Sequence, residues 1–117
     1  MRTSHCICIL SLLLLAGCAR EPPIGRDLPT DYGGTNPAFD ERLKARYPIG
    51  SLATALRGEL RKEGFDIVDH DFTDGYQESA EFSISDLVCK TSWSVYWSAD
   101  NDEKITLEKG KYRTVCL

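Results

Sequence analysis

The stretch DIVDHDFTDGYQESAE, residues 66–81, gathers six carboxylates around His70 with no lysine or arginine among them. Carboxylates in a flexible loop suit a hard cation such as Ca²⁺, and a histidine between acids is a candidate general base. However, Asp69, Asp71 and Asp74 miss the EF-hand spacing by one residue. No serine or cysteine nucleophile is tied to His70 in a catalytic motif. We therefore expect a solvated acidic loop, no metal, no cofactor and no catalytic residue, with a cation-binding site as the alternative.

Cysteine is the second residue type with chemistry to offer, and the chain contains five. Cys6 and Cys8 lie in CICILSLLLLA, an apolar run of eleven residues that follows the single charge of Arg2. This length matches the hydrophobic region of a signal peptide, because a membrane-spanning helix needs about 20 apolar residues. The small residues after the run are typical of a cleavage site.

The residues at the end of this run, Leu15-Ala16-Gly17-Cys18, resemble the lipobox of bacterial lipoproteins. The resemblance implies that residues 1–17 are a signal peptide and that the Cys18 thiol carries a diacylglycerol, the kind of group that palmitate labels. Two or three acyl chains anchor a protein stably, since each buried methylene contributes about 0.8 kcal/mol and one chain alone binds reversibly. Ala19 replaces the aspartate that tends to mark inner-membrane retention. The resemblance therefore implies the cell envelope, on the periplasmic face of the outer membrane.

The two remaining cysteines, Cys89 and Cys116, are an even number in an oxidising compartment. We expect them to form one disulfide that closes a loop of 27 residues, which stabilises the fold by about 3 to 4 kcal/mol in the chain-entropy model. Free thiols and zinc are the alternatives. Zinc is disfavoured because the chain has no C-x-x-C pair and only His70 remains after cleavage.

Removal of residues 1–17 takes Arg2 from the 14 basic side chains and leaves all 18 acidic ones, so the net charge changes from −4 to −5. An acidic surface of this kind argues against binding to nucleic acid. Residues 18–36 hold the lipidated cysteine and a stretch rich in proline and glycine, which we expect to be a flexible tether. Residues 37–117 are then a single domain.

Two amphipathic helices are expected at the start of this domain, within residues 36–48 and 51–64. Asn36 and Ser51 suit the N-caps, and Gly64 suits the position after the second helix. Their apolar stripes are Phe39, Leu43 and Tyr47 in the first, and Leu52, Leu56 and Leu60 in the second.

The remaining residues alternate in the manner of β-strands. FDIVD (65–69) and AEFSI (80–84) are short candidates, and VCKTSWSVYWSAD (88–100) is the strongest, with mostly apolar residues at its odd positions. After the turn residues ADND, the segment 104–117 returns as an antiparallel partner, with Ile105 and Leu107 expected to face the same way.

The pairing of the last two strands bears on the disulfide. If Trp97 pairs with Ile105, then Cys89 falls opposite Arg113, three residues short of Cys116. A disulfide then needs a bulge, an offset or a bend in the strands. The sequence as a whole predicts an α+β fold, with two N-terminal helices packed on a three- to four-stranded antiparallel sheet.

This order of elements is similar to the SmpA/OmlA-type lipoproteins of outer-membrane β-barrel assembly and to the repeats of β-lactamase-inhibitory proteins. The matching features are Gly50-Ser51 at a helix start, the aromatic strand SWSVYWSAD, and the turn into KITLEKG. The chain departs from the pattern at KEGF, where the family has a leucine-glycine-x-proline ending, and at Glu103, where it has glycine. The resemblance implies a domain that acts by protein contact.

The aromatic strand supplies the one candidate residue for binding a partner. Trp93 and Trp97 share its apolar face, which is typical of core residues, whereas Tyr96 lies between serines on the polar face. We expect a non-enzymatic, lipid-anchored envelope protein that acts by protein–protein contact through Tyr96, or structurally. The alternative function is a lipoprotein that binds a small ligand or a cation. The alternative role of Tyr96 is structural, in which its ring packs across the strands against a neighbour such as Thr106.

Overall fold

The computed structural model describes residues 21–28, 37–69 and 75–117 of the chain, without the Asp69 side chain. Its elements are the 3₁₀ turn η1 (Pro23–Gly25), the helices α2 (Pro37–Arg46) and α3 (Ala53–Lys62), and the strands β1 (Asp66–Asp69), β2 (Glu78–Ser85), β3 (Cys89–Ala99) and β4 (Ile105–Cys116). The strands form one antiparallel sheet in the order β1-β2-β3-β4. The α+β class is therefore as predicted, although the two helices lie in the middle of the full chain, after η1, and not at its N-terminus.

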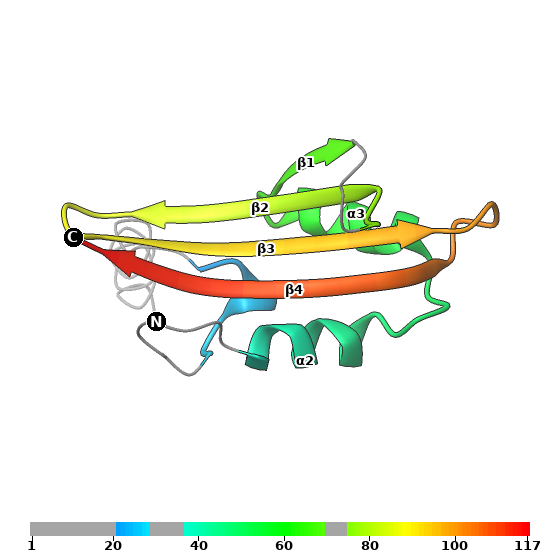
Figure 1. Cartoon of the computed structure of the whole chain (residues 1–117), viewed down its shortest axis with the longest axis horizontal. Coiled ribbons are helices and arrows are strands. Elements are labelled where there is room, and N and C mark those ends of the chain that lie inside the picture. Colours follow the sequence, from blue (N-terminus) through cyan, green and yellow to red (C-terminus); the bar gives the residue numbers. More distant parts are fainter. Residues whose placement is uncertain (1–20, 29–36, 70–74) are drawn as a thin grey trace, which may run out of the picture.

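Both helices contribute to a core on one face of the sheet (Figure 1). Figure 1 shows α3 behind β2 and β3, with α2 beside β4. Most of the predicted apolar stripes face this core, since Phe39 and Leu43 of α2 and Leu56 and Leu60 of α3 are fully buried. The exception is Leu52, which precedes α3 as its N-cap and is 51% exposed, whereas Tyr47 follows the end of α2 and packs partly buried against the core. The odd positions of β3 that were expected to be apolar and inward are also buried, namely Trp93, Val95 and Trp97. Burial of these large side chains, at about 1.5–3 kcal/mol each, supplies the main stabilisation of the fold.

The two ends of α3 show where local sequence rules hold and where they fail. Gly64 has φ +99° and Phe65 N–H donates to Leu60 O at 2.9 Å, which is the predicted glycine-terminated helix end. At the other end, Leu52 and not Ser51 is the N-cap, and no side chain caps the helix. The backbone of Ser51 instead accepts a hydrogen bond from Ile105 N–H at 2.8 Å. The sheet thus fixes this helix start in place of the serine hydroxyl, and Asn36, the other predicted N-cap, lies outside the described residues.

The register of β3 and β4 differs from the expected one by three residues. Trp97 pairs with Glu108, not with Ile105, and this brings Cys89 directly opposite Cys116 with 4.0 Å between their Cα atoms. The register changes between Ser98, which pairs with Leu107, and Ala99, which pairs with Ile105. Two residues are therefore spanned on one strand and three on the other, which is the arrangement of a β-bulge.

This bulge also changes which side chains reach the core. Ile105 is buried, whereas Leu107 is exposed on the opposite face of the sheet. The prediction that Ile105 and Leu107 face the same way is therefore wrong. Its physical reason is the extra residue, Thr106, because one inserted residue moves the following side chains to the other face of a strand.

Residues 21–28, expected to be part of a flexible tether, are packed into the core. Pro22 and Ile24 are fully buried, and Ile24 N–H donates to the Glu63 carboxylate at 2.8 Å. The indole N–H of Trp93 donates to Gly25 O at 3.2 Å. The prediction of a tether over residues 18–36 is therefore wrong for residues 21–28. The physical reason is that Trp93 offers an apolar surface, which the few apolar side chains of this segment cover. Residues 18–20 and 29–36 lie outside the described residues.

Candidate functional site

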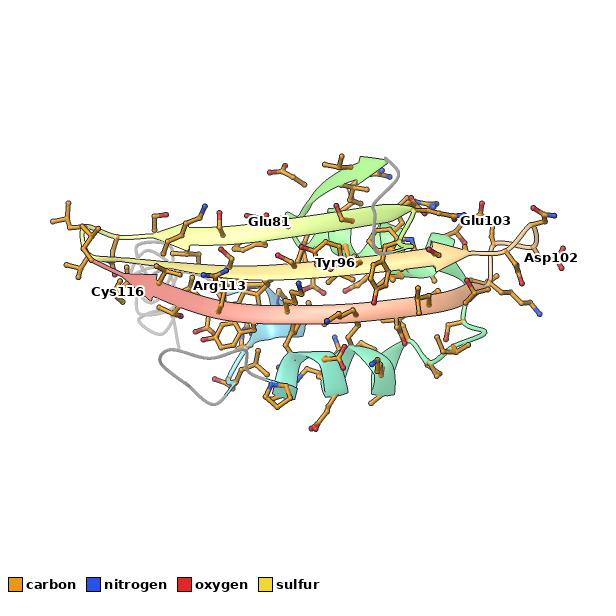
Figure 2. The ribbon with its side chains drawn as sticks, in the orientation of Figure 1. Glu81, Tyr96, Asp102, Glu103, Arg113 and Cys116 are labelled. Atoms are coloured by element: carbon orange, nitrogen blue, oxygen red, sulfur yellow. A yellow bond between two sulfur atoms is a disulfide. The ribbon has the colours of Figure 1, made fainter. Side chains whose placement is uncertain are left out.

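The face of the sheet that points away from the helices carries the candidate site. Figure 2 shows Glu81, Tyr96 and Arg113 on the three neighbouring strands β2, β3 and β4, with Cys116 at one end of the sheet and Glu103 at the other. A groove of about 640 Å³ lies on this face, lined by residues of these strands, by the turn at 86–88 and by Leu117. We call it the outer groove.

The groove follows from the sizes of the side chains that the register places side by side. Ser94 of β3 lies between Glu81 of β2 and Lys111 of β4, and the next row places Ser92 beside Arg113. The two serines are short, so they form a floor, and the longer charged side chains form its two sides. The outer groove therefore presents hydroxyls along its centre, a carboxylate on the β2 side and two cations on the β4 side.

Tyr96, the residue that the sequence predicts as a partner contact, lies half-buried in this groove. Its ring centroid is 5.7 Å from that of Tyr76, and Lys111 Nζ lies 5.4 Å from its centroid. Across the strands Tyr96 pairs with Lys109 and not with Thr106, whose hydroxyl donates to Ser98 O at 3.3 Å. A ring held by another ring and a cation presents a rigid aromatic surface at low entropic cost.

The chemistry of the groove lining is that of recognition by hydrogen bonds and charge. A serine acts as a nucleophile only with an adjacent base, and the carboxylates of the described lining are those of Glu81 and Asp86. The Asp86 carboxylate already accepts hydrogen bonds from Cys89 N–H at 2.6 Å and Val88 N–H at 2.7 Å, which lower its pKa. Asp86 therefore serves the turn, and Glu81 is left as the acidic group of the lining.

Cys89 and Cys116, the predicted disulfide pair, lie at bonding distance with their sulfur atoms 1.98 Å apart. Both also line one end of the outer groove. The sequence reasoning identified the pair from the cysteine count but missed the exposed apolar residues around it, Leu87, Val88, Val115 and Leu117. The signal for the first two was present in the sequence, as an apolar pair in the turn that follows Asp86.

The acidic stretch 66–81 is divided between the two faces of the sheet. Glu78 turns toward α3, where Arg57 donates to both of its oxygens at 2.9 and 2.7 Å and the indole N–H of Trp97 donates at 2.9 Å. Glu81 lies on the opposite face in the groove, and Asp66 is exposed. Residues 70–74, including His70, lie outside the described residues. Within the described ranges, no three histidine, cysteine or acidic side chains gather as a set of metal ligands.

Among the described residues, the core contains the acidic side chain of Glu108, which the sequence reasoning missed. Glu108 lies opposite Trp97 with only 4% of its surface exposed, and neither carboxylate oxygen has a hydrogen-bond partner in the described part of the chain. Burial raises the pKa of Glu108 to about 7, Lys44 acts against this increase and Asp40 adds to it. Lys44 and Asp40 are themselves paired at 2.9 Å on the surface of α2.

Cys18, the predicted lipidation site, lies outside the described residues. None of the helices in 21–28, 37–69 or 75–117 has the length and apolar character needed to cross a membrane. Comparisons of this chain with protein-family models, with curated proteins and with solved structures find no match.

Proposed function

We propose that this chain is an envelope lipoprotein, anchored through acylated Cys18, that binds a partner protein through the outer groove and catalyses no reaction. The observation that carries the proposal is the position of Tyr96 in a groove with charged sides, on the face that the helices leave uncovered. Removal of residues 1–17 would leave η1, α2 and α3 as the N-terminal elements of the mature domain, ahead of its sheet. The anchor would then hold the domain at the periplasmic face of the outer membrane.

The lining favours a protein partner for a physical reason. Aromatic and arginine side chains contribute much of the binding energy at protein interfaces, and Tyr96 and Arg113 lie on adjacent strands of this face. Opposite charges on the two sides, from Glu81 and from Lys111, fix the orientation of a partner by electrostatic complementarity. The groove thus offers an aromatic contact at its centre and a directional charge pattern around it.

A small polar ligand is the second candidate, and the size of the groove favours it. A volume of about 640 Å³ falls within the range of small-molecule sites, about 300 to 1,000 Å³. The serine floor suits a ligand rich in hydroxyl groups. Such a ligand would contact Ser92 and Ser94, whereas a protein partner would extend beyond them.

Photo-crosslinking in the intact envelope tests the first proposal. A photoreactive residue in place of Ser94, on the groove floor, should give one discrete protein adduct. The same residue in place of Thr54, which is exposed on α3, is the control and should give none. Adducts of equal yield at both positions, or no adduct at Ser94, would contradict the proposed partner.

The substitution Tyr96→Ser then tests the aromatic contact. It should abolish the adduct formed from Ser94 and leave the melting temperature within a few degrees of the wild type. If it instead lowers the free energy of unfolding by about 2 kcal/mol or more, as the loss of a packed aromatic does, then Tyr96 has a structural role.

The lipid anchor is tested by labelling with palmitate. Labelled palmitate should enter the wild type and not Cys18→Ser, and equal labelling of both would contradict the proposed anchor.

A further inference from the structure

One end of the sheet carries a cluster of exposed apolar side chains, which we call the apolar tip. It consists of Leu87 and Val88 in the turn between β2 and β3, Val115 near the end of β4, and Leu117. Leu87 and Leu117 are the most exposed, at 94% and 105% of their reference surface. Leu117 N–H donates to Val88 O at 2.8 Å, so the two strand ends of the tip are neighbours. Contiguous apolar groups of this kind mark a contact with a protein or a membrane.

The apolar tip is held in a fixed shape. The Cys89–Cys116 disulfide joins the two strands immediately behind it. The Asp86 carboxylate accepts hydrogen bonds from Val88 N–H and Cys89 N–H and so closes the turn that presents Leu87. A preorganised apolar loop loses little conformational entropy when it is buried against a binding surface. Its burial therefore costs less free energy than that of a flexible loop.

Positive charge lies beside the apolar tip although the chain as a whole is acidic. Lys90 pairs with Val115 across the two strands, and Arg113 lies two residues before Val115 on the same face of β4. The turn also carries the Asp86 carboxylate, which is hydrogen-bonded to Val88 N–H and Cys89 N–H and offsets one of these two positive charges. Lysine and arginine close to an anionic lipid surface contribute about 1 kcal/mol each to binding, so the charge at this end complements anionic phospholipid.

The length of chain before the core limits how far the anchor can lie from the packed segment 21–28. Cys18 precedes Glu21 by three residues, which span at most about 10 Å, and the next residue, Pro22, is already buried. Gly25 O then accepts a hydrogen bond from the indole N–H of Trp93, which lies four residues from Cys89 along β3, or about 13 Å. The segment 21–28 therefore lies over the half of the sheet that ends in the apolar tip (Figure 1).

We propose that the apolar tip inserts into the headgroup region of the anionic phospholipid bilayer that also holds acylated Cys18. This inference rests on the proposed lipid anchor. The tip then gives the domain a second, non-covalent contact beside the lipid, in the way that apolar side chains flanked by basic ones bind membrane interfaces. The tip residues also line the near end of the outer groove, so the membrane covers that end, while Tyr96, seven residues from Cys89 along β3, lies farther along the groove and stays accessible to a partner.

Tryptophan fluorescence of the acylated full-length mature protein tests this inference. Leu87→Trp places an indole at the tip, and Ile49→Trp is the matched control. Ile49 is also apolar and 60% exposed. It lies at the opposite end of the sheet, because the neighbouring Gly50 N–H donates to Ile105 O at the start of β4. In vesicles of phosphatidylethanolamine and phosphatidylglycerol with brominated acyl chains, Leu87→Trp should lose at least about twofold more fluorescence than Ile49→Trp. The charge variant Lys90→Glu, Arg113→Glu in the Leu87→Trp background should reduce this quenching.

The outcomes separate the tip from the anchor. If both variants sediment with the vesicles and are quenched equally, the anchor stands and the tip contact is overturned. If Leu87→Trp is shielded from aqueous iodide but not quenched by brominated lipid, the tip contacts protein, either a partner or a second copy, and the proposal is overturned. If neither variant sediments and Cys18 takes up no palmitate, the lipoprotein proposal itself fails and this inference fails with it.

Discussion

At the scale of single residues, Glu108 makes the stability of the fold depend on pH. Its pKa is raised from 4.5 to about 7 by burial, so between these values the folded state holds a proton that the unfolded state releases. The stabilisation from this proton is fully present below pH 4.5 and is lost as the pH rises through 7. Glu108→Gln keeps the shape of the side chain and removes the titration. At pH 8 the variant should exceed the wild type in free energy of unfolding by at most about 3 kcal/mol.

Urea denaturation at pH 5 and pH 8 measures this effect. The wild type should be less stable at pH 8, and Glu108→Gln should show a smaller difference between the two pH values. Glu41→Gln, which alters an exposed glutamate of α2, is the control and should keep the wild-type pH dependence. A Glu108→Gln variant with the wild-type dependence would show that the carboxyl does not titrate in this range.

The position of Glu108 also shows what alternation in the sequence does not reveal. The pattern of β3 predicts its buried face correctly, because an uninterrupted strand keeps a period of two. In β4 the bulge at Thr106 reverses the faces of the residues that follow, and nothing in KITLEKG indicates it. The disulfide could be predicted from the cysteine count alone, but its direct pairing across the strands depends on the shifted register, which only the folded sheet establishes.

At the scale of elements, η1 should contribute to stability as a part of the core. A Cβ atom at Gly25 would lie 2.3 Å from the Trp93 ring, which is too close for either group to remain in place. Gly25→Ala should therefore lower the free energy of unfolding by about 1 to 3 kcal/mol, as overpacking does. Gly58→Ala is the matched control, because a Cβ there meets nothing within 4 Å. Alanine is also the better helix former, so this variant should gain about 0.5 to 1 kcal/mol.

Thermal or urea unfolding of the two alanine variants checks this prediction. Opposite signs are expected for the same chemical change, and equal small effects would indicate that residues 21–28 do not pack on Trp93. The helices could be predicted from their apolar stripes and from Gly64, since both signals are local. η1 could not, because Pro22 and Ile24 stand among charged residues, prolines and glycines, and their burial depends on a surface that β3 provides.

At the scale of the whole molecule, the two longest strands, β3 and β4, pair along their length and are also closed at both ends. The turn at residues 100–104 joins β3 and β4 at one end, where the Asp100 carboxylate accepts hydrogen bonds from Asp102 N–H at 2.9 Å and Lys104 N–H at 3.0 Å. The Cys89–Cys116 disulfide joins them at the other. One face of this hairpin packs in the core under the helices, and the other forms the floor of the outer groove. Closure of its two ends therefore affects both the stability of the domain and the shape of the outer groove.

Reduction of the disulfide should therefore destabilise the whole domain. A closed loop with a sequence separation of 27 residues contributes about 3 to 4 kcal/mol in the chain-entropy model, which is a large part of the 5 to 15 kcal/mol typical of a domain. The melting temperature should fall markedly in reductant, and Cys89→Ala, Cys116→Ala should reproduce the lower value and no longer respond to reductant. Photo-crosslinking from Ser94 should weaken in the same variant, because the groove loses its closed end. An unchanged melting temperature, with both thiols shown to be free by alkylation, would mean that the turn and the core alone hold the hairpin together.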